Sequence, residues 1–110
     1  MTEAISALST AHITVDGMAP LFRRLQISMD EYGWVLERNG RRVFIDIGNI
    51  EELPQGALRQ ASLLLEGWPV SWIIFSYENS GPDRFENRMA MATMRAMAEL
   101  WPIVMDDFEN

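Results

Sequence analysis

The stretch from residue 34 to residue 47, WVLERNGRRVFIDI, decides the fold that this sequence predicts. Asn39 and Gly40 form the preferred pair for a two-residue type I′ hairpin turn, because both central residues of that turn need positive φ. Setting Arg38 opposite Arg41 fixes the register of the two strands. Alternation then gives the hairpin two faces, one with Trp34, Leu36, Val43, Ile45 and Ile47, and the other with Val35, Glu37, Arg42, Phe44 and Asp46.

The segment before the hairpin has two competing interpretations. Between Arg24 and Met29 apolar residues alternate strictly with polar ones, which predicts a strand over residues 23–29 and a three-stranded antiparallel meander. The alternative is a helix that begins near Ala19. The strict alternation favours the strand.

After the hairpin, apolar residues at helical spacing predict a helix over residues 54–66, with Pro54 in its first turn and Gly67 at its C-terminal cap. Residues 70–77, VSWIIFSY, are apolar on both faces, which is typical of a central strand. The connection is long enough for a crossover, so this strand could lie parallel to a neighbour.

The last predicted helix covers residues 82–101, with Ser80 as its cap, Pro82 in its first turn and Pro102 beyond its end. On a wheel of about 100° per residue one apolar stripe stands out. The stripe consists of Phe85, Met89, Ala92, Ala96 and Leu100. We expect Phe85, Met89, Ala92 and Leu100 to be core.

Together these elements predict one α+β domain over residues 1–110. A short helix within residues 2–11, with Ile5 and Leu8 inward, leads into the antiparallel meander (23–29, 34–38, 41–47). The crossover helix, a further central strand and the C-terminal helix follow. We expect both long helices to cover the sheet face that carries Trp34, and the acidic tail, residues 105–110, to be frayed.

Reactive side chains are nearly absent. The sequence has no cysteine, no lysine and one histidine, His12, and all nine basic residues are arginine. This excludes thiolate nucleophiles, Schiff-base lysines and zinc sites built from Cys and His. Because no partner is evident for His12, we interpret it as a structural or exposed residue rather than a general base. We therefore expect no enzymatic activity, no cofactor and no metal site.

Two other groups were candidates for ligand binding. Asp16, Asp46 and Glu78 lie near predicted strand ends and could gather around Mg²⁺, but their spacing matches no ligand loop and solvated turn residues are the better interpretation. The arginines within residues 38–42 could grip a phosphate or a carboxylate. We prefer a charged hairpin tip that protects an edge strand from aggregation.

The charge of the chain indicates the kind of partner. Sixteen acidic residues against nine arginines give a formal net charge of −7. A negative field repels nucleic acids and anionic membranes and attracts basic proteins, so we expect no nucleic acid and no membrane as partners. The N-terminal residues lack the pattern of a signal peptide, and no stretch is apolar enough to span a bilayer, so we expect a cytoplasmic protein.

In size, acidity and α+β character the chain resembles bacterial immunity proteins, which neutralise a toxin by covering its basic active site, and equally the secretion chaperones of the type III kind. We expect a non-catalytic acidic protein-binding module, an immunity protein or inhibitor of a basic toxin. The residues expected to bind the partner are Asp30, Glu31, Tyr32, Glu51, Glu52, Trp68, Met94, Trp101, Asp106, Asp107 and Glu109.

Two alternatives stay open. One is a homodimeric chaperone or adaptor for a secreted effector, which would use the methionine-rich last helix, with Met94, Met97 and Trp101 evenly balanced between core and interface. The other is a small carboxylate-dependent enzyme, which requires a concave pocket that holds two carboxylates with perturbed pKa values.

Overall fold

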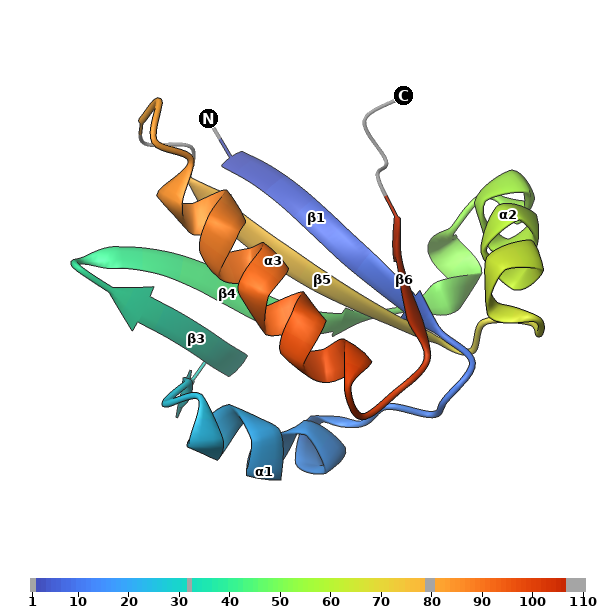
Figure 1. The fold of residues 1–110 in the computed structure, drawn as a ribbon, viewed down its shortest axis with the longest axis horizontal. Helices are drawn as coiled ribbons and strands as arrows, with labels where there is room; N and C mark the ends of the chain where they lie inside the picture. Colours follow the sequence, from blue (N-terminus) through green and yellow to red (C-terminus); the bar gives the residue numbers. More distant parts are fainter. Residues whose placement is uncertain (1, 32, 79–80, 107–110) are drawn as a thin grey trace.

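Six strands form one antiparallel sheet in the computed structural model, which describes residues 2–31, 33–78 and 81–106 (Figure 1). The elements in chain order are β1 (Thr2–Ser9), α1 (Val15–Arg24), β2 (Ser28–Asp30), β3 (Gly33–Arg38), β4 (Arg41–Gly48), the 3-10 helix η1 (Ile50–Glu52), α2 (Gln55–Leu65), β5 (Ser71–Glu78), α3 (Phe85–Ala98) and β6 (Ile103–Asp106). The strands lie side by side in the order β2-β3-β4-β5-β1-β6. The predicted α+β class is confirmed.

The hairpin of β3 and β4 has the predicted turn and register. Asn39 and Gly40 both have positive φ, 56° and 74°. Trp34 lies opposite Ile45, and Leu36 opposite Val43, as the alternation predicts. These four apolar side chains are buried, which shows that one face of the hairpin belongs to the core.

Strand β5 is central, as predicted, but it is not parallel to any neighbour. It pairs antiparallel with β4 on one side and with β1 on the other. Gly48, the last residue of β4, lies opposite Trp72 near the start of β5, so η1 and α2 return the chain at the same end of the sheet. The segment between the two strands is therefore not a crossover.

The predicted helix over residues 2–11 is wrong, because these residues form β1 up to Ser9. The strand lies between β5 and β6, which satisfy its backbone on both edges. Ala7 and Leu8 point to opposite faces of the sheet and are both fully buried. Packing on both faces gives the strand its stability, and this long-range environment overrides a local pattern of small residues.

Residues 15–30 combine the two competing interpretations. A helix, α1, does form; Thr14 caps it, with its Oγ1 accepting a hydrogen bond of 2.9 Å from the Gly17 N–H. The predicted strand over residues 23–29 is wrong in its first half, and a positive φ of 59° at Gln26 separates α1 from β2. The predicted meander is present, because β2 pairs with β3 and β3 with β4.

The ends of the two later helices differ from the prediction in detail. Pro54 is the N-cap of α2 rather than part of its first turn, and the left-handed cap at its other end is Glu66, with φ of 57°, rather than Gly67. Helix α3 begins three residues later than predicted, because Arg84 has a left-handed conformation with φ of 54°. The predicted cap, Ser80, lies outside the described residues.

The C-terminal segment is more ordered than expected. Met105 and Asp106 were predicted to be part of a frayed tail, but they belong to β6, which pairs with residues Ser6–Ser9 of β1. Residues 107–110 of the predicted tail lie outside the described residues.

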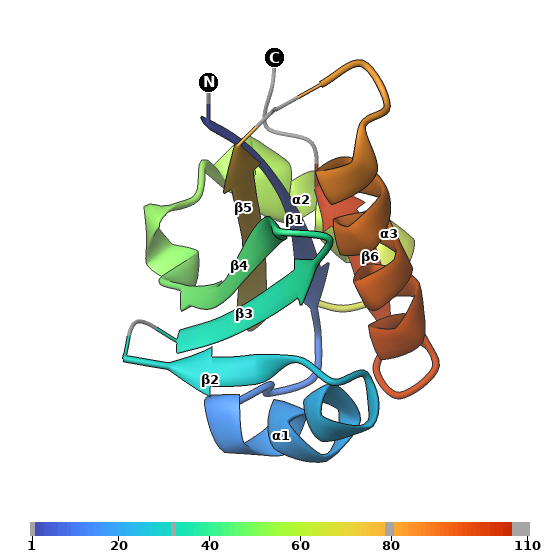
Figure 2. The same ribbon diagram turned by 90° about the vertical axis from the view of Figure 1, so that its left-hand side faces the viewer.

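The helices lie on both faces of the sheet, which corrects the expectation that both long helices cover one face. Helices α1 and α3 pack with the buried face of the hairpin in the main core. Helix α2 packs at one end of the opposite face, where Leu8, Leu58 and Ala61 form a second cluster with Trp72. Figure 1 shows α3 across the sheet and α2 beyond the strand ends, and Figure 2 shows α3 to one side of the sheet.

Helix α3 presents only part of the predicted stripe to the sheet: Met89 is buried in the main core and Phe85 and Ala96 pack against it. Met89, Met94 and Met97 are buried in the core, whereas Ala92 and Leu100, which were expected to be core, are exposed. The flexible methionine side chains fill the space between helix and sheet. These three methionines of α3 therefore belong to the core.

Candidate functional site

The face of the sheet opposite α1 and α3 is covered by α2 only at one end. In the part of the chain that the structure describes, the strands beyond that end carry no helix, and we call this region the open face. By register and alternation its residues on β2 to β5 are Ser28, Asp30, Val35, Glu37, Arg42, Phe44, Asp46, Ile74, Ser76 and Glu78, and Thr2 and Ala4 of β1 continue it.

An aromatic ring stands near the middle of the open face. Phe44 lies on β4 and has 40% of its surface exposed. Its neighbour on β3 is Val35, while its neighbour on β5 is Ser76, which in turn lies opposite Ala4 of β1. Because the side chains of Ser76 and Ala4 are short, the Phe44 ring projects further from the sheet than these two neighbours. Exposed aromatic residues are typical anchors for a protein partner.

Charged residues surround this ring. Arg42 Nε donates to Glu37 Oε2 over 2.6 Å, and both side chains are more than half exposed. This bond raises the pKa of Arg42, and the negative charges of Glu37 and Asp30 add to the effect. Asp30 therefore lies within electrostatic reach of Arg42. Asp46, opposite Ile74, is exposed two residues from Phe44 on the same strand.

Glu78 places a further carboxylate at the end of β5. Its Oε1 accepts a hydrogen bond of 3.0 Å from Thr2 Oγ1, and this bond lowers the pKa of Glu78. The open face thus carries the carboxylates of Asp30, Glu37, Asp46 and Glu78 against the one guanidinium of Arg42.

The layer of helices on the other side of the sheet has the opposite balance. We define this helix layer as α1 together with residues 81–99. Its charged residues are Asp16, Asp83, Glu86 and Glu99 against Arg23, Arg24, Arg84, Arg88 and Arg95. The remaining described residues hold ten carboxylates and only four arginines. The negative charge of the described chain therefore lies outside the helix layer.

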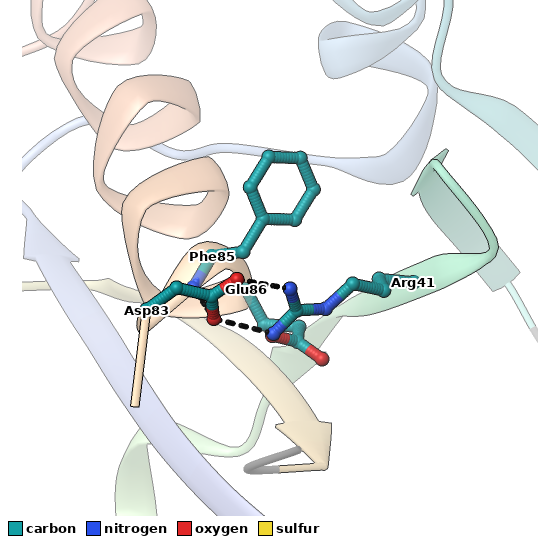
Figure 3. A network of polar contacts seen from close by, with 4 residues as sticks. All are labelled: Arg41, Asp83, Phe85 and Glu86. Atoms are coloured by element: carbon teal, nitrogen blue, oxygen red, sulfur yellow. Dashed lines mark hydrogen bonds and ion pairs between the residues drawn. The ribbon is translucent and has the colours of Figure 1, made fainter. Parts of the chain in front are cut away.

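A second concentration of polar groups joins the hairpin tip to the start of α3 (Figure 3). The two terminal nitrogens of Arg41 hold both carboxylate oxygens of Asp83, at 2.6 and 2.8 Å, and Nη2 also donates to Glu86 Oε1 over 2.5 Å. The guanidinium carbon lies 5.0 Å from the centre of the Phe85 ring. The bond from Arg41 lowers the pKa of Asp83 to about 2, while Asp83 and then Glu86 raise the pKa of Arg41.

Next to this network lies a cleft of about 650 Å³ between α3 and the strands β1, β5 and β6. Its walls carry the carboxylates of Glu3, Glu86 and Asp106. In the same wall the Asn87 amide donates a hydrogen bond of 2.8 Å to the Tyr77 hydroxyl. The cleft supplies the concavity that the enzyme alternative requires. Of these carboxylates, Glu86 is held by Arg41 in the network described above.

The other chemical candidates do not come together. Asp16, Asp46 and Glu78 lie on α1, β4 and β5, and nowhere in residues 2–31, 33–78 and 81–106 do three potential ligands gather that could hold a metal ion. His12 is exposed between β1 and α1. Within the same ranges, no helix has the length and apolar character needed to cross a bilayer.

The arginines of the hairpin tip are engaged within the chain. Arg38 donates to the carbonyl of Leu25 over 2.7 Å, Arg42 pairs with Glu37, and Arg41 holds the start of α3. These bonds engage both terminal nitrogens of Arg41 and the Nε of Arg42 within the chain itself. The preferred interpretation, a charged hairpin tip, is compatible with this geometry.

Four predicted partner-binding carboxylates lie at one end of the sheet. Asp30 and Glu31 are exposed at the turn between β2 and β3, and Glu51 and Glu52 are exposed in η1, directly after β4. Because β3 and β4 are antiparallel, the start of β3 and the end of β4 lie together. The structure therefore brings these four residues to one end of the open face.

The remaining predicted residues are scattered. Trp68 is half exposed in the loop between α2 and β5, and Trp101 is half-buried against the main core. Asp106 lines the cleft and does not lie with the four carboxylates at the end of the open face. Met94 has only 6% of its surface exposed, so the expected contact with a partner is wrong for the folded chain: the core holds its side chain. Tyr32, Asp107 and Glu109 lie outside the described residues.

Sequence reasoning did not single out Phe44 as a binding residue. The alternation of the hairpin already placed Phe44, Asp46 and Glu37 on one face. The missing information was which face the helices would cover, and this depends on contacts between segments far apart in the chain. A phenylalanine among charged residues on the polar side of a strong hairpin was the available signal.

Comparison of the chain with models of known protein families, with curated proteins and with solved structures finds no match.

Proposed function

We propose that this chain is a non-catalytic protein-binding module that recognises a basic partner protein. The observation that supports this most is the separation of charge: the helix layer balances its carboxylates with arginines, while the rest of the described chain has ten carboxylates against four arginines. Such a field accelerates encounter with a positive surface and orients it. An inhibitor or immunity protein of a basic toxin is the class that fits this chemistry best.

The same proposal places the protein in the cytoplasm, where a chain without cysteine and without need of disulfides is suited to the reducing environment. It assigns no role to a cofactor. The homodimeric chaperone or adaptor loses its expected surface, because Met89, Met94 and Met97 are in the core.

The test is kinetic. The product of the gene next to this one in its genome, if basic, is mixed with the chain in a stopped-flow instrument, and tryptophan fluorescence reports binding. We expect fast association that slows steeply as salt is raised from about 0.05 to about 0.3 M, because salt screens charges over a distance of about 10 Å. An association rate that does not change with salt would refute electrostatic steering, and sedimentation as a stable dimer without partner would favour the chaperone instead.

A further inference from the structure

We propose that the basic partner docks on the open face, with Phe44 inserted at the centre of the contact and the partner's arginines or lysines around it. This inference rests on the proposed function and specifies where and how the partner binds. It commits to one occupant, a protein surface that presents cationic side chains on both sides of an apolar one.

The shape of the open face fits such a surface. Three neighbouring strands, β3, β4 and β5, form this face, and Phe44 projects from the middle strand with 40% of its surface exposed. Ser76 and Ala4 continue the row beside the ring. Their short side chains leave room for an apolar group of the partner against the ring, which would cover area that is now in water.

The charge of the open face favours a partner surface of positive charge. Asp46 stands on one side of Phe44 along β4, and Glu37 and Arg42 on the other side hold each other over 2.6 Å. Glu37 and Arg42 neutralise each other, while Asp46 adds a negative charge on the other side of the ring. Arginine suits this setting, since its planar guanidinium binds a carboxylate through two nitrogens.

The same charge argues against a second copy of this chain as the occupant. Two open faces brought together would place like charges opposite each other. Exposed apolar residues also occur around the end of α2, at Leu63, Leu64 and Trp68. The nearby charges on α2 and its cap are Arg59 and Glu66, which balance, so that surface selects no charge.

The experiment uses the full chain and a short synthetic peptide with arginines on both sides of a central leucine. Two-dimensional NMR of the ¹⁵N-labelled protein follows the titration. We expect the largest shifts at the amides of Phe44, Asp46 and Ile74. Shifts concentrated at the cleft or at η1 would overturn the docking site and leave the proposed function in place, whereas no binding even at low salt would count against the function itself.

Two charge reversals that change the net charge equally provide the matched comparison. Asp46→Lys lies on the open face and Glu99→Lys in the helix layer, and both side chains are exposed. We expect Asp46→Lys to weaken peptide binding about tenfold and Glu99→Lys less than about twofold. Equal losses would mean that only total charge matters, which would overturn the site.

Phe44→Ala tests the anchor separately and keeps the test valid if a charge reversal prevents folding. We expect it to weaken binding of the leucine peptide about fivefold, and to leave unchanged the binding of a peptide in which glycine replaces the leucine. The same loss with both peptides would contradict an apolar contact at the ring. Dispersion of the NMR spectrum verifies that each variant is folded.

Discussion

The two faces of the sheet differ in how far their side chains are buried, as two phenylalanines on adjacent strands show. On β5, Phe75 is fully buried under the helix layer. On the adjacent strand, β4, Phe44 points toward solvent. On the covered face, side chains are apolar and their partners come from α1 and α3. On the open face, aromatic and charged groups remain together without such a cover. The difference separates a face whose burial stabilises the fold from a face that stays exposed, and the exposed face is the one on which we propose that a partner docks.

The largest effect should come from truncating the covered face. We expect Phe75→Ala to lower the free energy of unfolding by about 3–5 kcal/mol, because it removes a buried ring and leaves a cavity. Phe44→Ala, one strand away on the open face, should cost less than about 1 kcal/mol. Urea unfolding measures both. Similar losses for the two variants would mean that the open face is part of the core after all.

The next largest loss of stability is expected for a substitution at Gly48, at the end of the sheet that α2 covers. A Cβ added at Gly48 would overlap the Trp72 ring and lie 2.8 Å from Ile74 Cδ1, so we expect Gly48→Ala to cost about 1–3 kcal/mol. The matched control is Gly56→Ala in α2, where nothing lies within 4 Å of the new atom. That variant should gain up to about 1 kcal/mol from helix propensity, measured by the same unfolding assay. A gain in stability for both variants would show that the Trp72 side chain moves aside at little energetic cost.

The contact between the hairpin tip and α3 should appear as a dependence of stability on pH. The pKa of Asp83 is lowered from 3.8 to about 2, so its folded form binds a proton less readily than the unfolded chain. This contribution to stability is fully present above about pH 4 and is lost as the pH falls toward 2. Asp83→Asn should remove that part of the pH dependence in urea unfolding between pH 2 and 5. A wild-type profile identical to that of the variant would show that Arg41 does not favour the ionised Asp83.

The smallest effect is expected for the ion pair of the open face. Arg42 and Glu37 are both more than half exposed, and exposed pairs are screened by water and salt. Arg42→Gln should therefore leave the thermal midpoint of unfolding unchanged within error, while it makes the open face more negative. A clear loss of stability would indicate that the pair holds β3 and β4 together.

Local chemistry predicted some parts of this fold well. Asn39 and Gly40 specify their turn through backbone conformations that few residue types adopt, and the alternation beside them then determines the register. The helix over residues 55–65 and the central position of β5 follow from patterns of similar strength. In each case neighbours in the sequence contain the information.

Other parts depend on distant segments and could not be predicted in this way. Residues 2–9 become a strand only because β5 and β6 lie on both sides of it. The alternation at Leu25, Ile27 and Met29 indicated one long strand, yet Leu25 is the cap of α1 and Met29 is half exposed on the short β2. The candidate site follows the same division: Glu51 and Glu52 were proposed from the sequence as carboxylates for a partner, whereas the proposal for Phe44 needed the packing of the helices.

The position of β1 has a consequence for how this protein is made. Among the described strands β1 is synthesised before the others, yet it pairs with β5, which begins at Ser71, and with β6, which ends at Asp106. Its buried residues therefore have no partner strand until β5 has been synthesised. Slow or interrupted synthesis between these strands would leave residues 2–9 exposed for that time.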